Sequence, residues 1–245
     1  MTDEFIPGRN AVLEALRSGR SINKIFMAEG KQEGVIRQIT ALAKVNQVPI
    51  SHVPAKKLTE LYDGNHQGVI AAVAPRSYVE VEDILTVAKE RQEDPFVVIL
   101  AAIESPQNLG AIMRTAEIAG VHGIIIPKNN SVGLNATVAK ISAGASEYMP
   151  VARVTNLTQA VQFLQEQGLW IYGADMEGTT LWHQDMKGPM ALIIGGEDKG
   201  IPRLLLKNCD FKVSIPMKGK IPSLNASAAA AVMIYEVMRQ RWTGR

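Results

Sequence analysis

Hydrophobic residues follow two different patterns along the chain. In the first 74 residues, helical segments with apolar residues at every third or fourth position alternate with short apolar runs typical of strands. The predicted helices span 11–19, 33–47 and 55–63, and the predicted strands span 24–28, 49–53 and 68–75. This alternation predicts a small α/β unit at the start of the chain.

From Phe96 onwards, the strand candidates are uninterrupted apolar runs. They span 96–100, 123–127, 169–174, 190–196 and 211–216, with helix candidates between them and a final alanine-rich helix. Uninterrupted runs are typical of strands covered on both faces, so we expect a doubly wound α/β domain with a mostly parallel sheet. The charged stretch before Phe96 is predicted to connect the two parts. The predicted domains are 1–75 and 95–245, with a linker at 76–94.

Composition narrows the class of protein. No segment reaches the roughly 18 apolar residues of a membrane helix, and the first residues do not resemble a signal peptide. The single cysteine, Cys209, excludes an internal disulfide or a cysteine-rich metal cluster. We therefore expect a cytoplasmic protein without a metal. The net charge of +2 neither supports nor excludes RNA as a partner.

Candidate chemistry follows the strands, because ligands of open α/β sheets bind beyond the strands' carboxyl ends. After the strand at 96–100 come Asn108, Gly110 and Arg114. A helix that begins near Asn108 carries Arg114 within its first two turns. The same pattern also fits an Asn that caps a helix, followed by a surface Arg.

Two further strand ends carry unusual residues. Gly195 and Gly196 let the backbone approach a ligand closely, with Glu197 placed to orient it, although an ordinary turn has the same look. Ser223 and Asn225 precede an alanine-rich helix, which either of them could cap. The small alanines indicate that something packs closely against that helix.

Taken together, these segments resemble a known family. "NLGAIMRTA", "IIGGEDKG" and "IPMKGKIPSLNASAAAAVMIYEV" resemble, in order, the three signature motifs of the SPOUT superfamily, and most closely its TrmH-type RNA ribose 2′-O-methyltransferases. "GRNAVLEAL" and "HQGVIAAV" resemble the small RNA-binding domain of the L30e type that precedes the catalytic domain in one subgroup. The nearest subgroup methylates a guanosine ribose of 23S ribosomal RNA.

The resemblance implies a fold, a cofactor and an oligomeric state. It implies a C-terminal trefoil knot, which needs a slim terminal helix, and a homodimer formed through the knotted domain. The apolar face of the last helix, which includes Val232 and Tyr235, fits such a dimer as well as an ordinary core. The implied cofactor is S-adenosylmethionine, held largely by backbone groups. Its implied binding residues are Gly195, Gly196, Ile215, Met217 and Leu224.

The resemblance also implies catalytic residues, which are Asn108, Arg114, Glu197, Ser223 and Asn225. A guanidinium stays protonated, so a role for Arg114 as general base is physically awkward. Our hypothesis is that Arg114 binds the adjacent phosphate and polarises the ribose hydroxyl, while the other four residues fix the geometry. The chain departs from the family at Ala101 and Ser105, which leaves the shape of that loop open.

Alternative functions remain at this point. The same chemistry on transfer RNA or another ribosomal site fits the motifs, and so does a ribosome-assembly factor that binds RNA without catalysis. A Rossmann-type oxidoreductase lacks its glycine fingerprint here. His66, Arg9 and Asn10 in the N-terminal motifs are either RNA contacts or ordinary structural and surface residues.

Overall fold

The structure is a computed structural model that describes residues 4–30, 34–73, 77–197, 199–221 and 223–243. The chain forms two compact units. The first comprises 1–77 with 134–148, and the second comprises 78–133 with 149–245. The predicted boundary between 75 and 76 lies outside the described residues, and the functional division into domains stays a prediction.

The first unit contains a mixed four-stranded sheet in the order β1-β4-β2-β3. Only β2 and β3 run parallel. The strands are β1 (Glu4–Pro7), β2 (Ile22–Ala28), β3 (Ile50–Val53) and β4 (Val69–Val73), and the helices are α1 (Arg9–Arg17), α2 (Val35–Val45) and α3 (Ala55–Leu61). Helices α1 and α2 bury apolar residues such as Val12 and Ile39 in one core with the sheet. The sequence pattern did not predict strand β1.

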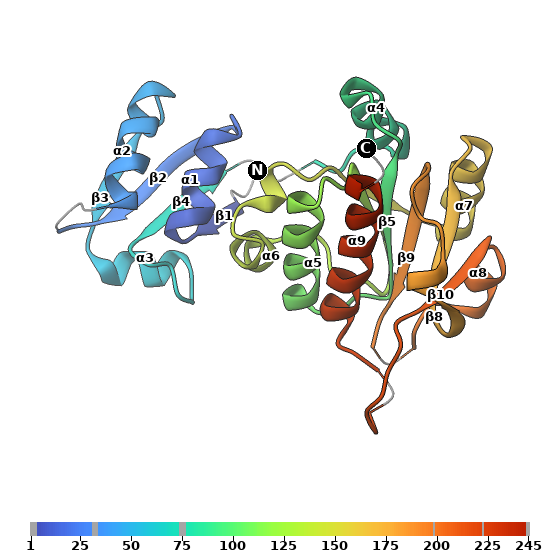
Figure 1. Ribbon diagram of the computed structural model, residues 1–245. Coiled ribbons are helices and arrows are strands. Elements are labelled where there is room, and N and C mark those ends of the chain that lie inside the picture. Colours follow the sequence, from blue (N-terminus) through green and yellow to red (C-terminus); the bar gives the residue numbers. More distant parts are fainter. Residues whose placement is uncertain (1–3, 31–33, 74–76, 198, 222, 244–245) are drawn as a thin grey trace. The chain divides into compact units, whose positions relative to one another are not determined.

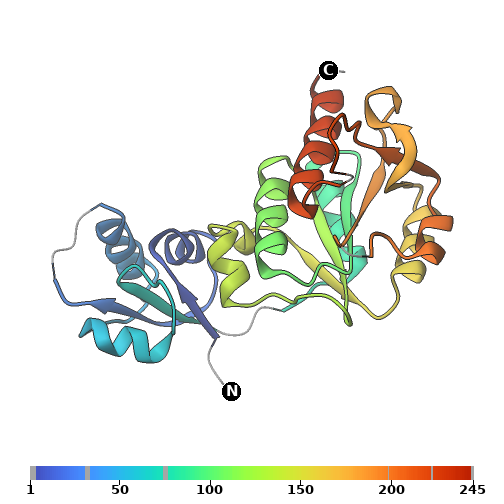
Figure 2. The same cartoon turned by 90° about the horizontal axis from the view of Figure 1, so that it is seen from below.

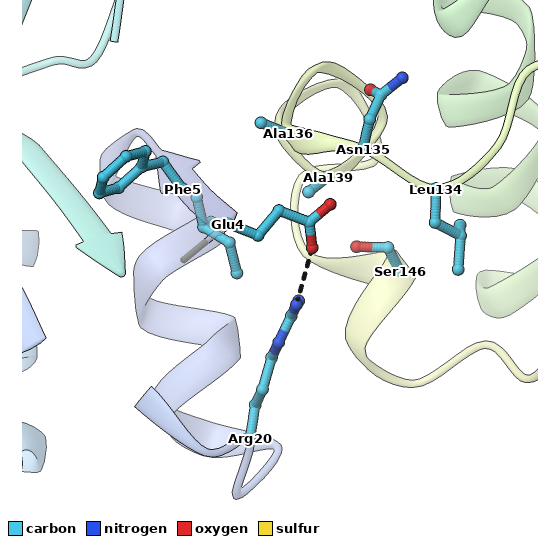
Figure 3. A pocket seen from close by; sticks show the side chains of 9 residues that line it. Glu4, Phe5, Arg20, Leu134, Asn135, Ala136, Ala139 and Ser146 are labelled. Carbon is cyan, nitrogen blue, oxygen red and sulfur yellow. Dashed lines mark hydrogen bonds and ion pairs between the residues drawn. The ribbon is translucent and has the colours of Figure 1, made fainter. Parts of the chain in front are cut away.

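A segment distant in sequence completes the first unit. It forms α6 (Ala136–Ile141) and the short helix η1 (Ala145–Glu147), which contact β1 and α1. The carboxylate of Glu147, only 3% exposed, lies 2.8 Å from Nη1 of Arg20. Nη2 of Arg20 lies 3.4 Å from Glu4 (Figure 3). The cavity beside this ion pair measures about 10 Å³, which is room for about one water. It therefore cannot hold a cofactor.

The second unit has a six-stranded sheet, parallel throughout, in the order β10-β8-β9-β5-β6-β7 (Figure 1). The strands are β5 (Phe96–Ala101), β6 (Gly123–Pro127), β7 (Val151–Val154), β8 (Trp170–Thr180), β9 (Met190–Gly195) and β10 (Phe211–Ser214). The predicted parallel α/β fold is confirmed, and the short β7 is an addition. The chain runs outward from β5 to β7 and then builds the other half, so its direction reverses between β5 and β9.

Helices cover both faces of this sheet (Figures 1 and 2). They are α4 (Val81–Arg91), α5 (Pro106–Ile118), α7 (Leu157–Glu166), α8 (Arg203–Lys207) and α9 (Ala226–Thr243), with the short η2 (Leu181–His183). Helices α4, α7 and α8 share one core with alternate strand residues such as Val97 and Ile99. Helices α5 and α9 lie side by side on the other face.

Helix α4 belongs to the second unit by its packing. A Cβ added to Gly123 would lie 2.6 Å from a side-chain carbon of Ile84, so the helix sits directly on β6. This segment was expected to act as a connection, and its helix is buried on one side. Within the described residues, none of the helices combines the length and hydrophobicity needed to cross a bilayer.

Candidate active site

The first motif opens helix α5, and its cap differs from the sequence-based alternative. The N-cap is Ser105, whose hydroxyl oxygen accepts a hydrogen bond from the backbone N–H of Asn108 at 3.4 Å, with Pro106 in the first turn. The interpretation of Asn108 as the helix cap is therefore wrong. Because Ser105 serves as the cap, the side chain of Asn108, a residue only 9% exposed, is available for other contacts.

Three side chains from the three motifs meet beside the ends of β5 and β9. Nδ2 of Asn108 donates to Oε1 of Glu197 at 3.2 Å. Nδ2 of Asn225 donates to Oδ1 of Asn108 at 3.0 Å and also to Oε1 of Glu197. We call Asn108, Glu197 and Asn225 the amide–carboxylate cluster. It lies at the reversal point of the sheet, where open α/β folds bind their ligands.

Asn225 serves this cluster and helix α9 with different atoms. Its Oδ1 accepts from the backbone N–H groups of Ser227 at 3.0 Å and Ala228 at 3.3 Å, which caps the helix. A reversed amide would place its NH₂ against these N–H donors, so the hydrogen bonds fix the amide orientation. The sequence left capping and a site role open for Asn225. The structure shows the cap and places its NH₂ group in the cluster, while a catalytic role stays a prediction.

Glu197 also touches the helix directly. Its Oε1 accepts from the backbone N–H of Ala226 at 3.2 Å, which places the carboxylate at the N-terminus of α9. The partial positive charge at a helix N-terminus stabilises a carboxylate there. All three hydrogen bonds to Glu197 from the described residues reach Oε1, and none reaches Oε2.

The two glycines of the second motif are required by the chain itself. A Cβ at Gly195 would lie 2.2 Å from the backbone of Gly200, and one at Gly196 would lie 2.2 Å from the carbonyl oxygen of Ala102. The N–H of Gly196 donates to Ala101 at 2.8 Å. Because these backbone contacts alone demand glycine, the glycine pair is no separate evidence for a ligand, and its cofactor role stays a prediction.

Two predicted catalytic residues lie outside the cluster's hydrogen bonds. Arg114 and Ser223 are exposed, and neither forms a hydrogen bond or ion pair with another described residue. Arg114 sits six residues beyond Asn108 on α5, which corresponds to about 9 Å along the helix axis. The structure therefore unites three of the five predicted residues and leaves the other two available to a substrate.

The loop between β10 and α9 has the chemistry that an adenine-containing cofactor needs. Ile215 is half-buried, while Met217 and Leu224 are each 40% exposed. The backbone of residues 215–221 makes no hydrogen bond with the rest of the described backbone. Unpaired amides and carbonyls beside apolar side chains suit a flat heterocycle, so these residues fit S-adenosylmethionine. Ile221, the most exposed apolar residue of the loop, escaped the sequence analysis.

In the first unit, His66 is engaged within its own loop. Its Nδ1 accepts from the backbone N–H of Gly68 at 3.1 Å, and its Nε2 lies 3.4 Å from the hydroxyl of Thr59. Nδ1 therefore stabilises the loop itself and Nε2 connects the loop to α3, which favours the structural interpretation of this residue.

Comparisons with known proteins agree with this geometry. Residues 95–235 match the SpoU rRNA Methylase family, and residues 5–79 match the family described as RNA 2'-O ribose methyltransferase substrate binding. YacO of Bacillus subtilis, assigned to the TrmH family of tRNA/rRNA methyltransferases, is 47% identical over 97% of this chain and 96% of its own length. A Staphylococcus aureus protein of the same assignment is 44% identical, with 98% of each chain covered.

Solved structures share the fold. The SpoU methyltransferase AviRb from Streptomyces viridochromogenes, in complex with AdoMet, is 25% identical with a TM-score of 0.84, and the match covers 99% of this chain and 92% of AviRb. An AdoMet-bound rRNA methyltransferase from Sinorhizobium meliloti shares the fold at 24% identity, with a TM-score of 0.81 over 97% of this chain and 87% of its own.

Proposed function

Because this chain belongs to the SpoU rRNA methylase family, we propose that it transfers a methyl group from S-adenosylmethionine to a ribose 2′-hydroxyl of RNA. The observation that carries the proposal is the amide–carboxylate cluster, in which Asn108, Glu197 and Asn225 join across three distant motifs. The match of residues 5–79 to a substrate-binding family supports RNA as the substrate.

The cofactor-binding residues we propose lie around the loop before α9. Ile215, Met217 and Leu224 supply apolar surface, and the unpaired backbone groups of the loop bind the polar edge of the adenine. The tight turn at Gly195 and Gly196 borders the same region. When bound, S-adenosylmethionine supplies a sulfonium-activated methyl group.

The chain's own side chains align and activate the ribose hydroxyl. Asn108 and Asn225 hold Glu197 through Oε1, which leaves Oε2 as an acceptor for the hydroxyl proton. Because a guanidinium group is a poor base and a good phosphate ligand, Arg114 binds the phosphate next to the hydroxyl. Ser223 is available to orient the ribose. The rate gain then comes mainly from alignment for an in-line displacement.

Transfer of a labelled methyl group to RNA tests these roles. Glu197→Gln keeps the size of the side chain but removes its charge, and we expect at least a roughly tenfold lower kcat with cofactor binding retained. Arg114→Lys should lower kcat more than cofactor affinity. Glu166→Gln is the control, because Glu166 is an exposed carboxylate on α7, on the opposite face of the sheet. Full activity of Glu197→Gln would remove the carboxylate from the mechanism.

For the target, we propose a guanosine of 23S ribosomal RNA, modified in the cytoplasm. Mass-spectrometric mapping of ribose methylation in ribosomal and transfer RNA, from cells with and without the gene, identifies the nucleotide. If deletion of the gene removes a methyl group from transfer RNA alone, the substrate is transfer RNA and not 23S ribosomal RNA. Loss of none, together with no cofactor binding, would favour the non-catalytic assembly factor.

We also propose that the protein acts as a homodimer through α9, with the trefoil knot that the family resemblance implies in the same domain. Met233 and Val237 of the predicted apolar face are buried in the core, whereas Tyr235 is 42% exposed and Trp242 is 75% exposed. These two residues, with Val232 and Met238, line a groove on the outer side of α9. Light scattering should give twice the chain mass, and Tyr235→Lys should shift it to one chain mass. A wild-type monomer at micromolar concentration would contradict the dimer.

A further inference from the structure

Arg9 in the first unit holds its guanidinium in a fixed position. Its backbone N–H donates to Oε1 of Gln67 at 3.2 Å, and its Nε donates to the backbone oxygen of Gln67 at 3.1 Å. Nη1 and Nη2 form no hydrogen bond with the described residues, and the residue is exposed. Nη1 and Nη2 of Arg9 are therefore held in a defined position and can donate hydrogen bonds to a ligand.

Several hydrogen bonds fix the loop around Gln67, which contacts Arg9. The N–H of Gln67 donates to Oδ1 of Asn65 at 3.3 Å, and His66 is bonded to Gly68 and Thr59. Gln67 has a φ of 51°, in the left-handed region that residues other than glycine rarely adopt. Such a conformation persists only where its surroundings enforce it, and it occurs often at binding sites.

A second cation, Lys56, lies on α3 about one helical turn from a residue that contacts this loop. Lys56 lies three residues before Thr59 on α3, so the two share a helix face, and Thr59 contacts His66. Lys56 forms no ion pair with a described residue, whereas its neighbour Lys57 pairs with Glu60 at 3.1 Å. We call Arg9 and Lys56 the basic pair.

The two other arginines on and just after α1 form ion pairs. Arg17, at the far end of α1, pairs with Glu14 at 2.7 Å, and Arg20 pairs with the buried Glu147 at 2.8 Å. Arg9 thus differs from them in having no acidic partner among the described residues.

We infer that the basic pair binds backbone phosphates of the RNA substrate, with Arg9 as the principal contact. This rests on the proposed function, which makes RNA the substrate. The planar fork of a guanidinium matches two phosphate oxygens. Because Gln67 already fixes this fork, little side-chain freedom is lost when RNA binds. The site is independent of sequence, so it positions the RNA and does not choose the nucleotide.

Filter binding of labelled large-subunit ribosomal RNA to the full chain tests the inference, between about 50 and 200 mM KCl and without cofactor. Arg9→Gln should bind about tenfold more weakly, and its plot of log affinity against log salt should be shallower by about 0.7 to 0.9. Arg9→Lys should keep the salt dependence but lose affinity, because it keeps the charge without the fork.

Arg17→Gln is the matched control, since it removes the same charge from the same helix. Lys56→Gln and Lys57→Gln form a second matched pair that leaves the Arg9–Gln67 bonds intact, so a misfolded Arg9 variant cannot conceal the answer. Lys56→Gln should weaken RNA binding and Lys57→Gln should not.

Equal binding by Arg9→Gln and Arg17→Gln, with equal binding by the lysine pair, overturns the inference, as does a wild-type chain that binds RNA without salt dependence. The proposed function is judged separately by methyl transfer. A chain that binds RNA through Arg9 but methylates none keeps this inference and loses the function. A chain that methylates RNA equally well with or without Arg9 keeps the function and loses the inference.

Discussion

Asn225 combines two roles that mutations can separate. Asn225→Ala removes the cap of α9, which costs about 1 kcal/mol of unfolding free energy. The lost hydrogen bonds to Asn108 and Glu197 add about 1 kcal/mol at most, because the side chain is exposed. In a chain of this size, a loss of about 1 kcal/mol lowers Tm by roughly 2–4 °C. The same change removes both donor bonds to the cluster, so methyl transfer should fall at least about tenfold.

Asn225→Ser separates the effects, because a serine oxygen still caps a helix but cannot extend an NH₂ group to Glu197. We expect it to keep the stability that the cap provides, with a Tm above that of Asn225→Ala, while losing methyl transfer. Asn156→Ala is the converse control, since Asn156 caps α7 through Thr158 and Gln159 and has no part in the cluster. It should lose stability like Asn225→Ala and keep activity. Calorimetry measures the Tm of each variant, and a methyl-transfer assay measures its activity. A fully active Asn225→Ser would refute the reasoning.

Three other changes follow from single contacts. Gly196→Ala would place a Cβ 2.2 Å from the carbonyl oxygen of Ala102 and should cost at least about 1–3 kcal/mol in denaturant unfolding, whereas Gly188→Ala meets no atom within 4 Å and should be near neutral. Burial lowers the pKa of His122 below its ordinary 6.5, so its neutral form stabilises the fold above that pH. This stability is lost as the pH falls from 6.5 through the lowered value, and His122→Gln should flatten the dependence of unfolding free energy on pH; an unchanged slope would contradict it. Burial raises the pKa of Cys209 to about 11, so alkylation near pH 8 should be slow until the chain is unfolded, and fast labelling of the native protein would contradict this.

The sequence predicted most of the elements because the core strands are long apolar runs whose pattern survives without tertiary information. It missed β1 and β7, each of four residues. Strands β3 and β10 have the same length but lie within the apolar runs at 49–53 and 211–216, which made them recognisable. The three motifs named Asn108, Glu197 and Asn225, but their contact depends on the strand order, which places β5 beside β9. The residues of a single motif do not show which strands become neighbours in the sheet.

Two details of the site were beyond sequence reasoning for a different reason. The glycines at 195 and 196 were interpreted as a turn that lets a ligand approach the backbone. Residue spacing does not reveal which atoms of the chain itself lie close to these two glycines. The atoms in question belong to Ala102 and Gly200 of the same chain. Likewise, the sequence departs from the family pattern at Ser105, which left the shape of this loop undetermined. The structure shows that the hydroxyl of Ser105 caps the N-terminus of helix α5.

The ion pair between Arg20 and Glu147 has a consequence for synthesis of the protein. A ribosome delivers Arg20 long before Glu147, and the first unit takes part of its native packing from 134–148. At ordinary elongation rates, the interval between residue 77 and residue 148 is on the order of ten seconds. During this time Glu4 is already available to Arg20, but the closer carboxylate of Glu147 has not yet been made. Translation speed across this stretch, and chaperones that act in the interval, are therefore expected to affect how much of the newly made chain reaches its native state.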